Sequence, residues 1–554
     1  MSVRPLLALT LVAATLAAPL RAPLGAQPGR AAAPAARDRF ADLVPAAEWA
    51  PYIRRDAALS PVIQRLWDEG MTRSQAMTLA QVLMDRHGQR LTGSPQSDAA
   101  QDWLVSTYRS WGVNARRERY GTWLGWNRGV THVDLVAPRV RSLEATAMAW
   151  SPATPRPVEA EVIAYPEGIT TPDAFDAWLP NVRGKVLLLN VPRLSCRSPQ
   201  QWQEFSTPAE LERVNAQQQA MQVAWNQLNV AMGGNTPAFW NKVRDAGAVA
   251  VFTFQWSNYP GINKVFGSPN QTLPTFAIGC EDYGLLVRMA RAGQGPRVRA
   301  FTDSELLGER PVSNVIAELK GSERPNEYVV LSAHFDSWSS ASGATDNGTG
   351  TITMLEAMRI LRQVVPNPKR TIIVGHWNGE EQGLNGSRAY SEDHPEVVAG
   401  LHALFNQDNG TGRIVNLSGG PIAGAGERLE GYLREIPNTL TQYLRFQRTS
   451  GQATGGSDHA SFSCHKAPAY GLGALGWDYS FTTWHTDRDS FDKVVEADLR
   501  HNATLVAMLA YLASEDPTFQ PHQVIDPLPA GPNGQPGVWR ECPKAQRQVP
   551  GVVR

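Results

Sequence analysis

The sequence predicts an α/β fold: a mostly parallel sheet with helices on both faces, joined to an inserted β-rich unit. After Pro311, apolar strands alternate with helical stretches, which is the pattern of a layered α/β domain. Between about residues 157 and 305, short apolar strands instead surround one long polar helix. The chain has 554 residues, more than one hydrophobic core usually spans, so at least two domains are expected.

The first residues are typical of a secretory signal. The apolar run that follows Arg4 ends near Leu20, and it is too short and too interrupted by proline to span a bilayer. Cleavage after Ala18 or Ala26 would follow small or apolar residues. We therefore assign residues 1–26 to a signal peptide and predict a secreted or periplasmic protein without a membrane span in its mature form. The alternative is a retained membrane anchor.

Charge and cysteine content restrict the partners and the compartment. Lys plus Arg and Asp plus Glu both number 52, so no net field favours nucleic acid or an anionic membrane. Cys196, Cys280, Cys464 and Cys542 can pair in an oxidising compartment. Their spacing forms neither a CxxC motif nor a Cys/His metal motif, and it leaves the pairing open.

Residues 37–155 are expected to form the N-terminal part of a catalytic domain, with residues 38–113 mostly helical. The stretch SPQSDAAQDWLVSTYRSWG predicts an amphipathic helix with aromatic and apolar residues on one face. Ser97 or Asp98 is the expected cap, and Gly112 the expected stop.

Residues 156–305 are expected to form a self-contained insert without a catalytic constellation. Its expected elements are strands at 159–165 and 184–191, a helical stretch at 210–232, and mixed segments at 239–254 and 273–279. We expect this insert to cover or frame a cleft; the alternative is a passive spacer.

Residues 306–515 are expected to carry the main α/β domain. The expected strands lie at 313–319, 327–337, 370–377, 401–409 and 466–473, and the expected helices at 351–365, 387–399 and 498–513. The tail at 516–554 is rich in Pro and Gly, which favours an irregular wrap over the surface.

Metal-type ligands follow the expected strands of this domain. In an open α/β sheet, ligands bind beyond the carboxyl ends of the strands. The candidates at these ends and in nearby loops are His334, Asp336, Asp346, Glu380, Glu381, Asp408 and His485. Their gathering in one domain indicates a single site.

The residue types favour a pair of zinc ions. Imidazole and carboxylate groups bind zinc, and a carboxylate can bridge two ions with its two oxygens. We assign Asp346 as the bridge. His334 and Asp408 complete one site, and Glu381 and His485 complete the other.

The remaining acids have separate expected roles. Glu380 is the expected general base, which takes a proton from a water activated by the two ions and passes it to a leaving amine. Successive strand residues face opposite sides, so Glu380 and Glu381 can serve one site only in a turn, which Gly379 and Gly383 permit. Asp336 is suited to accept the free N–H of His334 and fix its tautomer.

The motifs AHFDSW, GATDNGTG, NGEEQGLNGS, NQDNG and HTDRDSFD resemble the signature of the co-catalytic dizinc exopeptidases. This family includes zinc aminopeptidases, carboxypeptidase Q-like dipeptidases and glutamate carboxypeptidases. RGKVLLLN, KVRDAGAVAVFTF and LPTFAIG resemble the protease-associated domain that is often inserted in it. The resemblance implies the zinc-exopeptidase fold and the same ligand, base and orienting roles. Asp346 is followed by Asn347 where some members carry two acids.

The expected function is hydrolysis of the peptide bond next to a free terminus of a peptide or dipeptide, by aminopeptidase or dipeptidase action. Asp458 and His459, in GSDHASF, are candidate substrate-binding residues; the alternative is a locally hydrogen-bonded turn. A carboxypeptidase and a glutaminyl cyclase with one zinc are alternatives on the same fold. A receptor-like binding module without metals is the alternative from another class.

Overall fold

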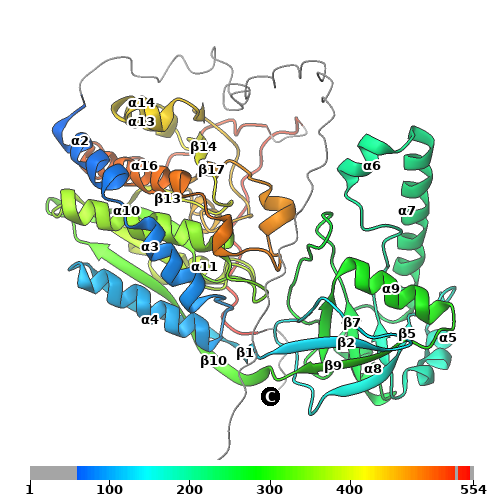
Figure 1. Ribbon diagram of the computed structural model, residues 1–554. Coiled ribbons are helices and arrows are strands. Elements are labelled where there is room, and N and C mark those ends of the chain that lie inside the picture. Colours follow the sequence, from blue (N-terminus) through cyan, green and yellow to red (C-terminus); the bar gives the residue numbers. More distant parts are fainter. Residues whose placement is uncertain (1–58, 531–533, 550–554) are drawn as a thin grey trace, which may run out of the picture.

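The chain folds around two large sheets. The computed structural model describes residues 59–530 and 534–549, so the expected signal at 1–26 lies outside the described residues. A six-stranded sheet and an eight-stranded sheet lie in separate halves of the molecule, and a small three-stranded sheet accompanies the first (Figure 1).

The first sheet carries the ligand-bearing strands. Its order is β1 (Asn114–Asn127), β10 (Glu305–Leu319), β12 (Arg370–Trp377), β11 (Arg324–His334), β13 (Leu401–Asn406) and β16 (Ala469–Gly471). β11 runs parallel to both β12 and β13, and β13 runs parallel to β16. β1 and β10 add antiparallel pairs at one side. The expected parallel core with strands at these positions is confirmed.

Helices cover this sheet on both sides. The main ones are α2 (Pro61–Trp67), α3 (Ala76–Gln81), α4 (Pro95–Ser110), α10 (Thr349–Val364), α11 (Asn385–Asp393), α12 (Pro395–Ala399), α13 (Ala425–Glu435), α14 (Asn438–Thr441), α15 (Ala460–Ser463) and α16 (Glu496–Glu515). Shorter helical turns are η2 (Asp68–Thr72), η3 (Val82–His87), η5 (Ala344–Gly348), η6 (Tyr479–Thr483) and η7 (Phe491–Lys493). The expected helix at 387–399 is divided into α11 and α12, because Pro395 cannot continue a helix from the residues before it.

Alternate residues of the central strands build two cores. Ile372 and Val374 of β12 pack with α4, α10 and α16 on one face. Ile373, between them, packs with residues of α11, α12 and α15 on the other. All eight residues of β12 are buried, which is what a strand covered on both faces requires.

The start of α4 differs from the expected one. Its cap is Ser94 rather than Ser97 or Asp98, because Pro95 occupies the first helical position and Ser97 N bonds to Ser94 Oγ.

The second sheet is formed by strands between residues 131 and 302. Its order is β3 (Arg141–Ser142), β2 (Thr131–Ala137), β9 (Arg297–Thr302), β5 (Val158–Ala164), β6 (Val186–Leu188), β7 (Ala250–Thr253), β8 (Thr275–Ile278) and β4 (Ala145–Ala147). Strands β5 to β8 are parallel, and the outer pairs are antiparallel. β2, β3 and β4 lie before the expected boundary at residue 156, yet they pair in this sheet.

Helices accompany the second sheet. They are α5 (Pro172–Trp178), η4 (Leu179–Val182), α6 (Pro199–Phe205), α7 (Pro208–Ala231), α8 (Pro237–Asp245) and α9 (Cys280–Arg291). The polar helix expected at 210–232 is α7, which is buried only at Leu228 and Ala231 and projects from this half with α6 (Figure 1).

The small sheet and the tail complete the main domain. The small sheet consists of β15 (Arg445–Gln447), β14 (Ile414–Ser418) and β17 (Gly473–Ala474). Beyond α16, the described part of the tail has no helix or strand of its own. Disulfides join Cys464 to Cys542, which fixes the tail, and Cys196 to Cys280, within the second half.

Candidate metal centre

The candidate ligands meet at one edge of the first sheet. His334 is the last residue of β11, the two glutamates follow β12, and Asp408 follows β13. These three strands are adjacent and parallel, so their carboxyl ends lie together. Asp346 lies in η5, between β11 and α10, and His485 comes from the loop after η6.

Two groups of ligand atoms share Asp346. His334 Nε2 lies 3.0 Å from Asp408 Oδ1 and 3.3 Å from Asp346 Oδ1. His485 Nε2 lies 2.9 Å from Glu381 Oε2 and 3.1 Å from Asp346 Oδ2. Each oxygen of Asp346 therefore faces a different histidine. In each group the ligand atoms lie within 4.8 Å of one another.

The donor set fits metal cations. The three carboxylates are buried or nearly so, and among the described residues none forms an ion pair with Lys or Arg. Glu381 Oε1 is buried without a hydrogen-bond partner in the part of the chain that the structure describes. Buried carboxylates require a compensating charge, and imidazole with carboxylate is a donor set that zinc binds. A third group, Cys464, His465 and Cys542, is unsuited because its cysteines form a disulfide.

Burial and mutual repulsion shift the pKa values of the acids. Burial raises the pKa of Glu381 to about 7, and the charge of Asp346 contributes to that rise. Burial also raises the pKa of Glu380 well above its usual value. Burial opposes ionisation of Asp346 too, but hydrogen bonds from His334 and His485 outweigh it and hold its pKa below the usual range. A cation between these acids would favour their ionised forms.

The turn after β12 separates the two glutamates, as the sequence predicts. Gly379 has φ +80°, and Gly383 has φ +116°, values that favour glycine. Glu381 contacts His485, whereas the Glu380 carboxylate has no hydrogen bond or ion pair within residues 59–530 and 534–549. Both glutamates border a cavity of about 470 Å³.

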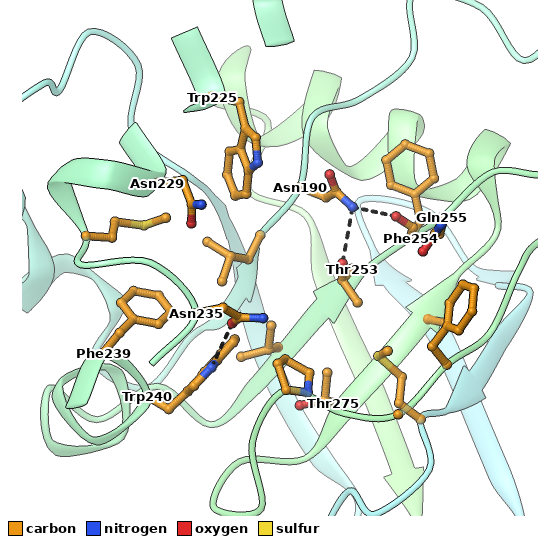
Figure 2. Close-up of a pocket in the computed structure, with 18 of the residues that line it drawn as sticks. Asn190, Trp225, Asn229, Asn235, Phe239, Trp240, Thr253, Phe254, Gln255 and Thr275 are labelled. Carbon is orange, nitrogen blue, oxygen red and sulfur yellow. Dashed lines mark hydrogen bonds between the residues drawn. The ribbon is translucent and has the colours of Figure 1, made fainter. Parts of the chain in front are cut away.

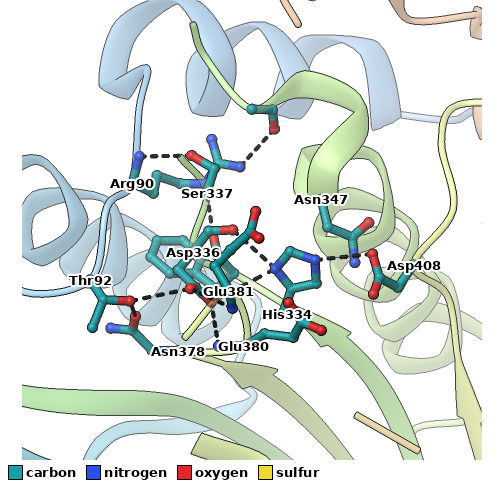
Figure 3. A network of polar contacts seen from close by, with 12 residues as sticks. Arg90, Thr92, His334, Asp336, Ser337, Asn347, Asn378, Glu380, Glu381 and Asp408 are labelled. Carbon is teal, nitrogen blue, oxygen red and sulfur yellow. Dashed lines mark hydrogen bonds and ion pairs between the residues drawn. The ribbon is translucent and has the colours of Figure 1, made fainter. Parts of the chain in front are cut away.

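Asp336 orients the site in a different way from the one expected. Its backbone carbonyl, not its carboxylate, lies 3.0 Å from His334 Nδ1. The nearest carboxylate oxygen is 3.7 Å from that nitrogen, which is too long for a hydrogen bond. The carboxylate instead accepts the backbone N–H groups of Glu380, at 3.1 Å, and Glu381, at 3.3 Å (Figure 3). It therefore fixes the turn that carries both glutamates.

Sequence reasoning missed three supporting residues. Thr92 donates to the carboxylate of Asp336, as Figure 3 shows. Arg90 is fully buried and donates to four backbone carbonyls, including those of Ser342 and Gly343. Asp489 accepts the backbone N–H groups of Thr345 and Asp346. The motif HTDRDSFD contains Asp489 and so could have indicated it, and the stretch RLTGSPQSDAAQDWLVSTYRSWGV, which resembles the segment opening the family's catalytic domain, begins with Arg90 and contains Thr92.

Asp458 and His459 lie behind the cavity wall rather than in it. Asp458 is fully buried, and its carboxylate forms no ion pair with Lys or Arg in the described chain. Burial raises its pKa to about 7. The charges of His334 and Asp408 act on it, so it lies on their side of the cluster. Neither Asp458 nor His459 lines the cavity.

Comparison with known proteins shows what the main domain is similar to. Residues 314–510 match Peptidase family M28. The chain is 26% identical to carboxypeptidase Q of Mus musculus over 332 residues, which cover 60% of this chain and 64% of that protein. It is 24% identical to carboxypeptidase Q of Homo sapiens over 344 residues, which cover 62% and 66%. The chain thus matches slightly less than two thirds of the length of these relatives.

Solved structures show the same fold. A peptidase M28 precursor from Shewanella amazonensis superposes with a TM-score of 0.59 at 23% identity, covering 85% of this chain and 98% of that one. A zinc aminopeptidase from Bacillus subtilis superposes with a TM-score of 0.50 at 19% identity, covering 80% and 94%. A mixed sheet with two ligand groups at its carboxyl edge defines a class of α/β domains built to hold metal ions. Within that class, residues 314–510 of this chain are similar to Peptidase family M28.

Proposed function

We propose that this protein is a zinc-dependent exopeptidase that hydrolyses the peptide bond next to a free terminus, by aminopeptidase or dipeptidase action. The observation that carries the proposal is Asp346, whose two oxygens face His334 and His485 separately. One carboxylate shared between two histidine–carboxylate groups is what a pair of zinc ions requires. The match of residues 314–510 to Peptidase family M28 supports the same chemistry.

The residues of the site have distinct roles in this proposal. Asp346, His334, Asp408, Glu381 and His485 would hold two zinc ions, which supply Lewis acidity and lower the pKa of a water. Glu380 takes the proton of the attacking water and later gives it to the departing amine. Its buried position supports this role, because burial raises the pKa of Glu380 and a base must also release its proton as an acid.

Aminopeptidase or dipeptidase action requires a site that recognises the free N-terminus of the substrate. We infer that the substrate's ammonium group is held on the Asp458 side of the cluster, since Asp458 is a buried carboxylate that forms no ion pair with Lys or Arg among the described residues. An aminopeptidase or dipeptidase uses that ammonium to position its substrate. His459, the neighbour of Asp458, is proposed to support the same region.

The compartment and the insert are also proposals. We infer secretion or export to the periplasm, because the segment at 1–26 has signal-peptide character and disulfides persist in oxidising compartments. Within the described ranges, no helix is long and apolar enough to cross a membrane. We propose that the second sheet, from β2 to β9, is a protease-associated domain inserted between β1 and β10.

Elemental analysis and a substrate panel test the proposal. The purified protein is expected to hold two zinc ions per chain and to cleave dipeptides and amino-acid amides. N-acetylation of a good substrate should abolish turnover, because it removes the ammonium charge. Cleavage of the blocked peptide, with loss on C-terminal amidation instead, would assign the enzyme as a carboxypeptidase. A reproducible content of one zinc would favour the cyclase.

A further inference from the structure

A second cavity lies in the half built on the second sheet. Its volume is about 480 Å³, within the range of small-molecule sites. Figure 2 shows Trp225 and Asn229 on one side of it, with Phe239 and Trp240 nearby. Aromatic rings thus form much of its wall. Asn229 is half-buried, and its side-chain amide lines the cavity.

This cavity adjoins the candidate metal centre. Lys264 and Phe266 line it, and both belong to a segment that is bound to the loop carrying His485. Val265 N donates to His485 O at 2.9 Å, and Lys264 forms an antiparallel bridge with Thr486. The ring of Phe266 lies 5.1 Å from that of His485.

Lys264 stands at the wall between the two cavities. Its Nζ lies 3.7 Å from the centre of the Trp484 ring. Trp484 stacks on His485, with ring centres 4.1 Å apart, and lines the cavity that contains Glu380. The Trp484 ring therefore lies between the ammonium group of Lys264 and the His485 ring, and only a ligand that extends from the metal centre past the edge of Trp484 would meet Lys264.

Lys264 offers a charge that the described part of the protein does not use. Among these residues, its ammonium group has no ion pair and no hydrogen-bond acceptor, and the side chain is half-buried. Contact with an aromatic face is a weaker interaction than a charged hydrogen bond. A carboxylate supplied by a ligand would complete the environment of Lys264.

We propose that this second cavity binds the residue on the leaving side of the scissile bond, and that it selects a large aromatic side chain with a free carboxylate. The side chain packs among the rings of the cavity, and the carboxylate pairs with Lys264. This inference rests on the proposed exopeptidase function for the identity of the ligand. Lys264 is then a specificity-determining residue, not a catalytic one.

A binding experiment tests the assignment without turnover. Calorimetry with the full-length protein measures binding of N-acetyl-L-phenylalanine, which has an aromatic ring and a carboxylate but no free amine. We expect binding to weaken about 10- to 100-fold in Lys264→Met, which removes a charged hydrogen bond and keeps the apolar stem. Lys242→Met should bind as the wild type does, since Lys242 is exposed, pairs with Asp176 and does not line the cavity.

The amide of the same ligand lacks the carboxylate, so it distinguishes the contribution of the carboxylate to binding from that of the aromatic ring. N-acetyl-L-phenylalanine amide should bind the wild type and Lys264→Met equally weakly. Trp225→Ala should weaken binding of N-acetyl-L-phenylalanine but not of N-acetylglycine, because only the former has a ring to pack. Equal binding of the acid by wild type and Lys264→Met, or no binding by either, would overturn the inference.

Kinetics distinguish this inference from the proposed function. For Ala-Phe, kcat/KM should fall about 10- to 100-fold in Lys264→Met, whereas for Ala-Phe amide it should change little. Equal losses for both substrates would show that Lys264 acts only through Trp484 and His485, and would overturn its specificity role. If the wild type binds the acid as expected yet hydrolyses no peptide, the proposed function fails and the ligand assignment of the cavity stands.

Discussion

The adjacent glutamates differ in what their carboxylates contact. Glu381 lies 2.9 Å from His485, whereas Glu380 has no ion pair among the described residues and borders the open cavity. Glu381→Gln should release or weaken one zinc, because a neutral amide is a poorer ligand. Glu380→Gln should keep both zinc ions but lower kcat by roughly 10²–10⁴, since the general base is lost. Metal analysis and steady-state kinetics on both variants check this; loss of metal from Glu380→Gln alone would reverse the assignment.

Substitutions of Asp346 and Asp336 should have different effects, because Asp346 is a proposed metal ligand and Asp336 only supports the turn that carries the glutamates. Asp346→Ala should remove metal from both groups, because each group uses one of its oxygens. Asp336→Asn should keep the metals but lower activity or affinity roughly 10- to 100-fold. The amide nitrogen cannot accept one of the two backbone N–H groups that hold the Glu380–Glu381 turn. Retention of both ions in Asp346→Ala, measured by elemental analysis, would contradict the bridging role.

At the scale of elements, α10 approaches the end of β13 closely. A Cβ on Gly350 would lie 2.6 Å from Gln407 O and would meet the side chain of Asn347, which itself donates to Gln407 O. Asn347 and Gln407 are the neighbours of Asp346 and Asp408. Gly350→Ala should therefore lower the free energy of unfolding by about 1–3 kcal/mol and reduce zinc content.

A glycine in open space provides the control for Gly350→Ala. Gly431 lies in α13 and is exposed, and a Cβ added to it would have nothing within 4 Å among the described residues. Gly431→Ala should raise the free energy of unfolding by about 0.5–1 kcal/mol, because alanine loses less backbone entropy in a helix. Denaturant unfolding and metal analysis measure both variants. An unchanged free energy of unfolding and zinc content in Gly350→Ala would show that the contact between α10 and the end of β13 can relax.

The elements that can be predicted from the sequence are those with local patterns. Strand β12 and helices α7, α10 and α16 have strong apolar periodicity or clear breaks, so their positions follow from the sequence to within a few residues. The positions of the candidate metal ligands after the expected strands also predict that these residues lie close together. The contacts of Thr92 with Asp336 and of Arg90 with Phe335 could not be predicted, because these partners lie more than 240 residues away in the sequence. Strands β2 and β4 fall outside the predicted bounds of the insert, because pairing in a sheet is not a local property.

At the scale of the whole molecule, two of the connections between the two halves bear on the site. β1 and β10 pair along most of their length and lead into β2 and out of β9, so they join the two sheets covalently. The segment around Lys264 pairs with the loop of His485 and forms the second junction. The candidate metal centre lies beside that second junction. The half built on the second sheet therefore contributes to the position of one ligand as well as to the adjoining cavity.

Acid should destabilise the whole protein through histidines that are buried and neutral. His402 is fully buried in β13, where Gln520 N donates to Nδ1 at 3.1 Å and Tyr432 OH lies 3.0 Å from Nε2. Burial lowers the pKa of His402 to about 3, and the charge of Arg370 contributes to that shift. A proton on Nδ1 would also lose the Gln520 bond. Burial likewise lowers the pKa of His376 to about 3.

The loss of stability in acid follows from the difference between the histidine pKa values of the unfolded and folded states. The unfolded state, with a histidine pKa of about 6.5, binds the proton before the folded state does. The stabilisation is therefore complete above pH 6.5 and is lost as the pH falls toward 3. Between pH 6.5 and pH 4.5, protonation of His402 in the unfolded state should by itself lower the free energy of unfolding by about 2–3 kcal/mol.

His402→Asn keeps an acceptor near Gln520 N but cannot be protonated, so urea unfolding should show a smaller loss of unfolding free energy between pH 7.5 and pH 4.5 than in the wild type. Replacing the exposed His132 by Asn should leave the wild-type loss unchanged, and an equal loss in His402→Asn would contradict the assignment.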